Sequence, residues 1–103
     1  MSRRELKDLY RLYYDWLVRF LDERDPVGLL TEGNPGREYE PEARKMLRLL
    51  AAELSRDELA DRVHAIFVEF FTPSSAGDRE TYVPIADAML ANWRRMRSDL
   101  SQD

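Results

Sequence analysis

The chain has 103 residues, a formal net charge of −4, 44% hydrophobic residues and no cysteine. This length suits one domain with a single modest core, and the composition is too apolar for a disordered chain. The lack of cysteine excludes disulfides, cysteine-ligated metals and a thiol nucleophile. No stretch resembles a signal peptide or approaches the ~20 apolar residues of a membrane span, so we expect a cytoplasmic protein that does not enter membranes.

The first predicted helix covers residues 2–23. Apolar residues recur along it at intervals of three and four, which is the spacing of one helical face. They are Leu6, Leu9, Tyr10, Tyr13, Leu17, Phe20 and Leu21. Because Leu12, Tyr14 and Val18 make a second side apolar, we expect this helix to be central or covered by the segment that follows it. Pro26 ends the helix, since the residue before a proline resists the helical conformation.

A connector with the sequence DPVGLLTEGNPGREYEP follows at 25–41, and it holds three of the four glycines and three of the five prolines. Seven acidic and two basic residues lie between positions 22 and 42, a local balance of −5 in a chain of −4 overall. An ordered acidic loop of this kind would attract a basic partner. The alternative is that these acids only solubilise a long crossover.

Three more helices are predicted, at 41–54, 56–71 and 81–99. Pro41 suits a first helical turn, and Ser55 with Glu58 matches a capping box. Residues 72–78 are turn-forming and end the third helix. The pattern therefore predicts an all-α fold: a four-helix bundle in a single domain over 1–103, with a long ordered acidic connector between its first two helices.

His64 is the single histidine of the chain. By helical spacing it lies beside the apolar face of its helix, so we interpret it as a partly buried residue with one hydrogen bond. A role as general base would require an orienting partner such as Asp61 or Glu69. No nucleophile motif accompanies it, and the sequence therefore predicts no enzyme.

Cofactor and metal sites are not indicated either. The glycines of the connector lack the lysine and hydroxyl residue of a phosphate-binding loop. The carboxylates Glu38, Glu40 and Glu42 do not follow the alternating spacing of a calcium loop. We expect no metal and no cofactor.

Basic residues form two clusters, one near each end of the chain. The first contains Arg3, Arg4, Lys7 and Arg11, and the second contains Arg94, Arg95 and Arg97. A hydrated helix face explains each cluster. If the helix ends meet in space the two clusters could form one basic patch, although Glu5 and Asp8 dilute it. The net charge of −4 argues against a nucleic-acid partner, because duplex binding depends on a basic surface.

Four stretches spaced along residues 15–90 resemble a group of small bacterial all-helical proteins: DPVGLL, EYEPEARKMLRLL, SRDELADRVHAIFVEFF and YVPIADAML. The shared pattern is an Asp-Pro-Ile/Val-Gly turn, an acid-Tyr-acid step into the second helix and a Tyr-x-x-Ile-Ala fourth helix. Many members are domains of unknown function, and others resemble immunity proteins of contact-dependent growth inhibition and related polymorphic toxin systems. The resemblance implies no catalytic residue. We interpret Pro26, Gly28 and Tyr39 as architectural.

Two functions compete on these grounds. The first is a non-catalytic protein-binding domain, most concretely an immunity protein that neutralises a cognate bacterial toxin encoded nearby. Its expected contact residues lie on the connector, at Glu32, Arg37, Glu38, Glu40 and Glu42. The second is a small accessory or regulatory domain that forms a homodimer through the extra apolar side of the first helix.

Overall fold

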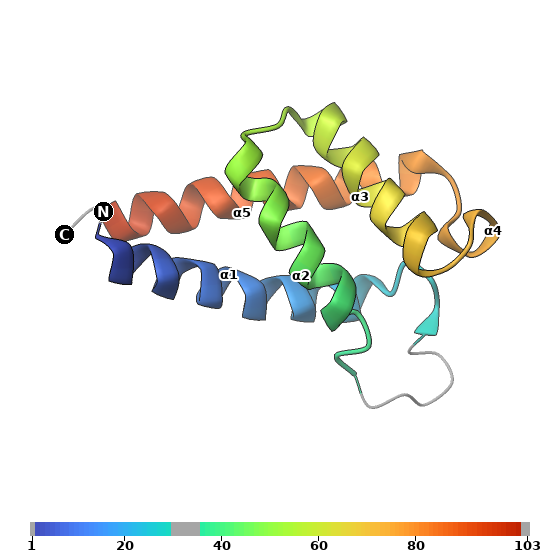
Figure 1. Cartoon of the computed structure of the whole chain (residues 1–103), viewed down its shortest axis with the longest axis horizontal. Coiled ribbons are helices and arrows are strands. Elements are labelled where there is room, and N and C mark those ends of the chain that lie inside the picture. The colour runs from blue at the N-terminus through green and yellow to red at the C-terminus, as the bar shows by residue number, and fades with distance from the viewer. Residues whose placement is uncertain (1, 30–35, 102–103) are drawn as a thin grey trace.

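The computed structural model describes residues 2–29 and 36–101, and these residues form helices and turns without a strand. In chain order the elements are α1 (Arg3–Arg24), α2 (Glu40–Leu49), the 3-10 turn η2 (Leu50–Ala52), α3 (Arg56–Phe70), the short helix α4 (Pro73–Ala76), the 3-10 turn η3 (Arg79–Tyr82) and α5 (Val83–Ser101) (Figure 1). The predicted all-α class is confirmed.

The two longest helices, α1 and α5, pack against each other and run in opposite directions (Figure 1). The N-terminal end of α1 therefore lies beside the C-terminal end of α5. Helix α2 packs on α1 and crosses it obliquely, and α3 packs against both α2 and α5 (Figure 1). Because α2 crosses its neighbour instead of running along it, the finer prediction of a four-helix bundle with an acidic connector is not confirmed.

Helix starts follow the capping chemistry of the sequence. The Ser2 hydroxyl accepts the N–H of Glu5 while the Glu5 carboxylate accepts the N–H of Ser2. The predicted capping box of Ser55 and Glu58 is confirmed by the same reciprocal pair at the start of α3. The second helix is shorter than expected. The α-helix ends at Leu49, the 3-10 turn η2 follows it, and Glu53 after η2 has a left-handed backbone with φ 52°.

The segment 72–78, predicted as a turn, contains the extra helix α4. The hydroxyl oxygen of Thr72 accepts the N–H of Ser75 and so caps this single turn. The hydroxyl of Tyr82 donates a 2.6 Å hydrogen bond to the carbonyl of Ala76. This contact joins α4 to η3, the turn that leads into α5. A helix of one turn is too short to produce the periodicity by which a sequence reveals a helix.

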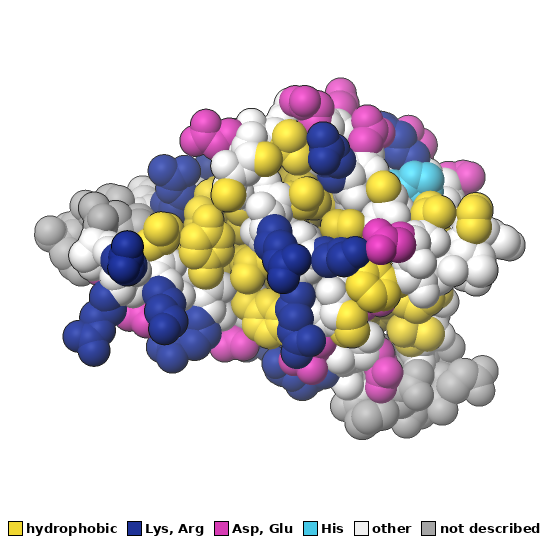
Figure 2. All heavy atoms as spheres, in the orientation of Figure 1, with side chains coloured by type: hydrophobic (Ala, Val, Ile, Leu, Met, Phe, Trp, Pro, Cys, Tyr) yellow, Lys and Arg dark blue, Asp and Glu magenta, His cyan; other side chains and the backbone are white. Residues whose placement is uncertain are grey.

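The outer face of α2 is basic. Arg44 and Arg48 are exposed, and Lys45 forms a 2.8 Å ion pair with Glu69 of α3. Lys45 also lies 5.2 Å above the ring of Phe70, which is 40% exposed. Figure 2 shows these Lys and Arg side chains beside hydrophobic ones over α2, and a second basic group over the N-terminal part of α1.

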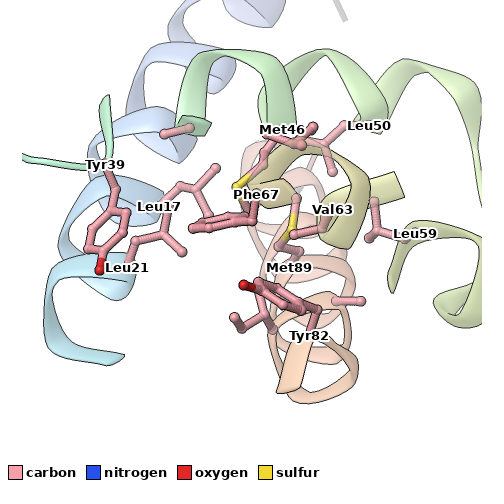
Figure 3. Packing of buried hydrophobic residues seen from close by; sticks show 14 of the residues in the cluster. Leu17, Leu21, Tyr39, Met46, Leu50, Leu59, Val63, Phe67, Tyr82 and Met89 are labelled. Atoms are coloured by element: carbon pink, nitrogen blue, oxygen red, sulfur yellow. The ribbon is translucent and has the colours of Figure 1, made fainter. Parts of the chain in front are cut away.

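The core lies between α1, α2, α3 and α5. The largest fully buried side chains of the core are Tyr13, Tyr39, Tyr82, Phe67, Leu9, Leu17, Leu21, Met46, Leu59, Ile85 and Met89, whereas Leu6 of the stripe predicted for the first helix is 40% exposed. Figure 3 shows Phe67 of α3 at the centre of the cluster, between Leu17 of α1 and Met89 of α5. The hydroxyl of Tyr13 donates a 2.8 Å hydrogen bond to the carbonyl of Met89, which joins α1 to α5.

The second apolar side of α1 is divided between the core and the surface. Val18 is fully buried. Tyr14 is partly buried, and its hydroxyl donates a 3.2 Å hydrogen bond to Glu40 of α2. Leu12 is 56% exposed. Of the three residues expected at a homodimer interface, Leu12 alone is largely exposed, and the homodimer itself stays a prediction.

Candidate functional site

The connector leaves α1 through a tight turn. Asp25 ends α1 in a left-handed conformation with φ 47°, and its N–H donates to the carbonyl of Leu21. The Asp25 carbonyl accepts the N–H of Gly28 at 3.1 Å, and Gly28 has φ 78°. Pro26 occupies the second position of this turn, where its fixed φ fits and no N–H is required. Pro26 and Gly28 therefore have the architectural roles that the sequence indicated.

Tyr39 fastens the far end of the connector to α1. Its side chain is fully buried, with ring centroids 5.9 Å from Phe67 and 6.5 Å from Phe71. Its hydroxyl donates a 2.6 Å hydrogen bond to Asp25 Oδ1 and accepts the N–H of Val27 at 3.1 Å. Burial, together with the hydrogen bond to Asp25, raises the pKa of Tyr39 to about 12. One hydroxyl thus holds both the end of α1 and the turn that follows it.

Arg37 makes a second clamp between the connector and α1. Its backbone is left-handed with φ 60°, and its N–H donates to Asp22 Oδ2 at 2.9 Å. Its guanidinium binds Glu40 Oε1 at 2.7 Å, and the same oxygen accepts the hydroxyl of Tyr14. The hydrogen bond and charge of Arg37 lower the pKa of Glu40. The carboxylate of Glu40 therefore joins three parts of the same chain.

The five predicted contact residues differ widely in their surroundings. Arg37 and Glu40 pair with each other, and Glu38 is partly exposed. Glu32 lies outside the described residues. Glu42 is the least accessible of the described residues in this set, because only 4% of its surface is exposed.

Burial gives Glu42 an unusual environment. Its Oε2 atom has no hydrogen-bond partner among the residues that the structure describes. Desolvation raises the pKa of Glu42, because a charged carboxylate is disfavoured where water cannot solvate it. Glu42 follows Tyr39 by three residues, so its charge lies just inside the first turn of α2. The positive end of the helix dipole favours a negative charge at this position, but water does not solvate the buried carboxylate.

His64 is held as a structural residue. Its Nε2–H donates a 2.9 Å hydrogen bond to the carbonyl of Gly77, and its ring lies 5.3 Å from that of Tyr82. Asp61 and Glu69, which the sequence offered as orienting partners, form ion pairs with other side chains. His64 thus joins α3 to the segment after α4 through this hydrogen bond.

A groove lies at the opposite end of the molecule from the connector. It consists of two adjoining hollows, of about 230 and 330 Å³, at the place where α1, η2, α3 and α5 meet. Both hollows include Leu50, Glu53, Trp93 and Arg97 in their walls. The sequence analysis missed this groove, because its residues come from four separate segments that no spacing pattern connects.

Residues 2–29 and 36–101 contain neither a metal site of clustered side chains nor a membrane-spanning helix. No group of three or more histidine, aspartate or glutamate side chains is arranged to hold a metal ion. No helix in this part of the chain combines the length and the apolar character needed to cross a bilayer.

Comparisons of the chain with protein-family models, with characterised proteins and with solved structures find no match. The resemblance to small bacterial helical proteins therefore depends on the spaced residues quoted above. What the chain does has to be argued from its own surface.

Proposed function

We propose that this chain is a non-catalytic protein-binding domain and, most concretely, an immunity protein that neutralises a bacterial toxin encoded nearby. The observation that carries the proposal is the clamped connector. Tyr39 fixes its two ends to one another, and Arg37 fixes it again to α1. A recognition segment that leaves and returns at fixed points loses less conformational freedom on binding than a loose loop, and this favours affinity.

The acidic side chains beside the connector favour a partner with a basic surface. Glu23 is exposed at the end of α1, and Glu38 is partly exposed at the entrance to α2. Asp22, Asp25 and Glu40 make the hydrogen bonds and the ion pair that hold the two described ends of the connector, so we do not count them as contacts for a partner. An acidic edge would steer a basic surface toward the domain, such as the active-site region of a toxin that acts on an anionic substrate.

The test begins with the protein encoded beside this chain. We expect the two proteins to form a 1:1 complex, and we expect the chain to protect cells that express its neighbour. Calorimetry then compares the wild type with the Glu23→Lys/Glu38→Lys variant. Binding should weaken by about tenfold or more, because two attractive charges become repulsive. Glu40 and Glu42 are left unchanged, since reversing either charge would disturb the fold.

A matched control reverses two exposed acids of α5, Asp87 and Asp99, which lie away from the connector. This variant should keep its affinity within about twofold. If both double variants bound the neighbouring protein with equal affinity, the connector would not be the binding surface. A neighbour that neither binds the chain nor is neutralised by it would overturn the immunity role.

A further inference from the structure

The antiparallel packing of α1 on α5 joins the two basic clusters that lie near opposite ends of the sequence (Figure 1). Arg3 and Lys7 are exposed on the first turns of α1, and Arg94 and Arg97 are exposed on the last turns of α5. The two helix ends therefore meet in space, and Leu6 of α1 and Arg97 of α5 line the same hollow. Figure 2 shows part of this patch next to hydrophobic side chains at the N-terminal end of α1.

Acidic side chains near this patch are engaged locally. Glu5 accepts the N–H of Ser2 in the cap of α1. Asp8 forms a 3.5 Å ion pair with Arg11. Residues 3–11, Glu53 and residues 94–99 together hold seven Arg and Lys side chains against four Asp and Glu side chains, so this end keeps a positive balance in a chain whose net charge is negative.

The floor of the groove at this end is aromatic. Trp93 packs against Tyr10 with ring centroids 5.1 Å apart, and the guanidinium of Arg97 lies 5.9 Å above the Trp93 ring. On the α1 side the wall includes Leu6, which is 40% exposed. The wall of the other hollow includes Leu54, which precedes α3, together with Leu59 of α3 and Leu90 of α5. A hollow with apolar walls and an exposed leucine at its edge favours an apolar side chain as its occupant.

The rim of the groove is cationic. Arg94 and Arg97 line it directly, and Glu53 is the acid that lines both hollows. Lys7 lies one helical turn before Tyr10, and Arg3 one turn before Leu6, so both follow the α1 wall. Arginine binds carboxylates through two parallel hydrogen bonds, and this pairing is stronger than one with a neutral acceptor.

We infer that this groove binds an acidic amphipathic segment of a partner protein. Apolar side chains of the segment occupy the two hollows, and its flanking Asp or Glu side chains pair with Arg94, Arg97 and Lys7. A nucleic acid fits less well, because the walls are leucine-rich and the chain is acidic overall. The surface differs from the connector, so this inference does not depend on the proposed immunity role.

The test uses Trp93 as its reporter. The chain contains two tryptophans, so a Trp16→Phe variant leaves Trp93 as the single one. Random short peptides displayed on phage are selected against the full chain, and the enriched sequences are synthesised. We expect these sequences to combine bulky apolar residues with Asp or Glu, and to shift the Trp93 emission saturably. Added salt should weaken the binding, because exposed charges contribute to it.

The decisive variant is Arg94→Glu/Arg97→Glu. It should bind the acidic peptides about tenfold more weakly or worse. A matched control reverses Arg19 and Arg62, which are exposed on α1 and α3, belong to neither basic cluster and do not line the groove. The control should bind like the wild type. Circular dichroism verifies that both variants remain folded.

Three results would overturn the inference. The first is enrichment of peptides without acidic residues, or no enrichment at all. The second is unchanged peptide affinity in the Arg94→Glu/Arg97→Glu variant. The third is evidence for a different occupant of the groove. If sedimentation shows a dimer that these reversals abolish, the occupant is a second copy of the chain. If the chain binds phosphatidylglycerol vesicles and no peptide, the occupant is a lipid surface.

Discussion

The hydroxyl of Tyr39 donates a 2.6 Å hydrogen bond to Asp25, so a residue at the entrance to α2 fixes the last turn of α1. The two residues are 14 positions apart in sequence, and the same hydroxyl also accepts the N–H of Val27. Asp25 adopts a left-handed backbone conformation, which residues other than glycine adopt less readily. The contact with Tyr39 stabilises Asp25 in this conformation and sets the distance between the two helices.

Replacing Tyr39 with phenylalanine should lower the free energy of unfolding by about 1–3 kcal/mol, because the Asp25 carboxylate and the Val27 N–H each lose a partner. Urea denaturation followed by circular dichroism measures this loss. Tyr10→Phe is the matched control, since Tyr10 is only partly buried and makes its contact with Trp93 through its ring. Equal stability of the two variants would show that the Tyr39 hydroxyl does not fasten the connector.

The two acids that flank Tyr39 should respond differently to charge reversal. Glu40→Lys places a cation beside Arg37 and removes the acceptor of Tyr14, so it should lower the melting temperature. Glu38→Lys should leave the melting temperature nearly unchanged. Arg37 lowers the pKa of Glu40, so the stability that this pair supplies is present above pH 4.5 and is lost as the pH falls through the lowered pKa. Similar melting temperatures for both variants at neutral pH would contradict the clamp.

Glu42 should make the protein less stable as the pH rises. Burial raises its pKa above the ordinary value of 4.5, so the folded chain holds this proton more tightly than the unfolded chain does. Its contribution to stability is therefore fully present below pH 4.5 and is lost as the pH rises through the raised pKa. Glu42→Gln removes the charge and should stabilise the protein at neutral pH by about 1–2 kcal/mol.

Thermal unfolding at acidic and neutral pH checks this expectation. The stability gained by Glu42→Gln should shrink below pH 4.5, where wild-type Glu42 is protonated as well. Glu53→Gln serves as the control, because Glu53 is exposed and the change should have little effect at either pH. A gain of the same size at both pH values would show that ionisation of Glu42 is not its cause.

Variants of Val18 and Leu12, on the second apolar side of α1, distinguish a role in core packing from a role in dimerisation. Val18→Ala should cost about 1–3 kcal/mol of stability, since Val18 is fully buried in the core. Leu12→Ala should change stability by less than about 0.5 kcal/mol, because its side chain is 56% exposed. Sedimentation of the Leu12→Glu variant tests the homodimer. A wild-type dimer that this change dissociates would restore the self-association model despite the burial of Val18.

Sequence periodicity located the long helices because each buries one stripe of side chains. Leu9, Tyr13, Leu17 and Leu21 follow the period of an α-helix, and all four are buried. The oblique crossing of α2 could not be predicted this way, since a stripe identifies the buried face of a helix but not the angle at which its neighbour crosses. The same limit explains the groove, whose walls depend on how four segments pack.

The candidate site was predictable where one residue decides a local geometry. Tyr39, flanked by acids at the start of a helix, correctly indicated an anchor. The clamp between Asp22 and Arg37 was not predictable, because a 15-residue separation brings them together without a pattern. A signal for the burial of Glu42 did exist: it lies one helical turn before Met46, which is on the buried stripe of α2.

The hydrogen bond from Tyr13 to Met89 spans 76 positions of the chain, and it has a consequence for synthesis. While the chain emerges from the ribosome, α1 is complete long before the helix that covers it. The part of its apolar surface that packs on α5 therefore stays uncovered during synthesis, although α2 is available to cover another part earlier. We therefore expect a chain truncated before α5 to expose apolar core residues such as Tyr13 and to aggregate more readily than the full chain.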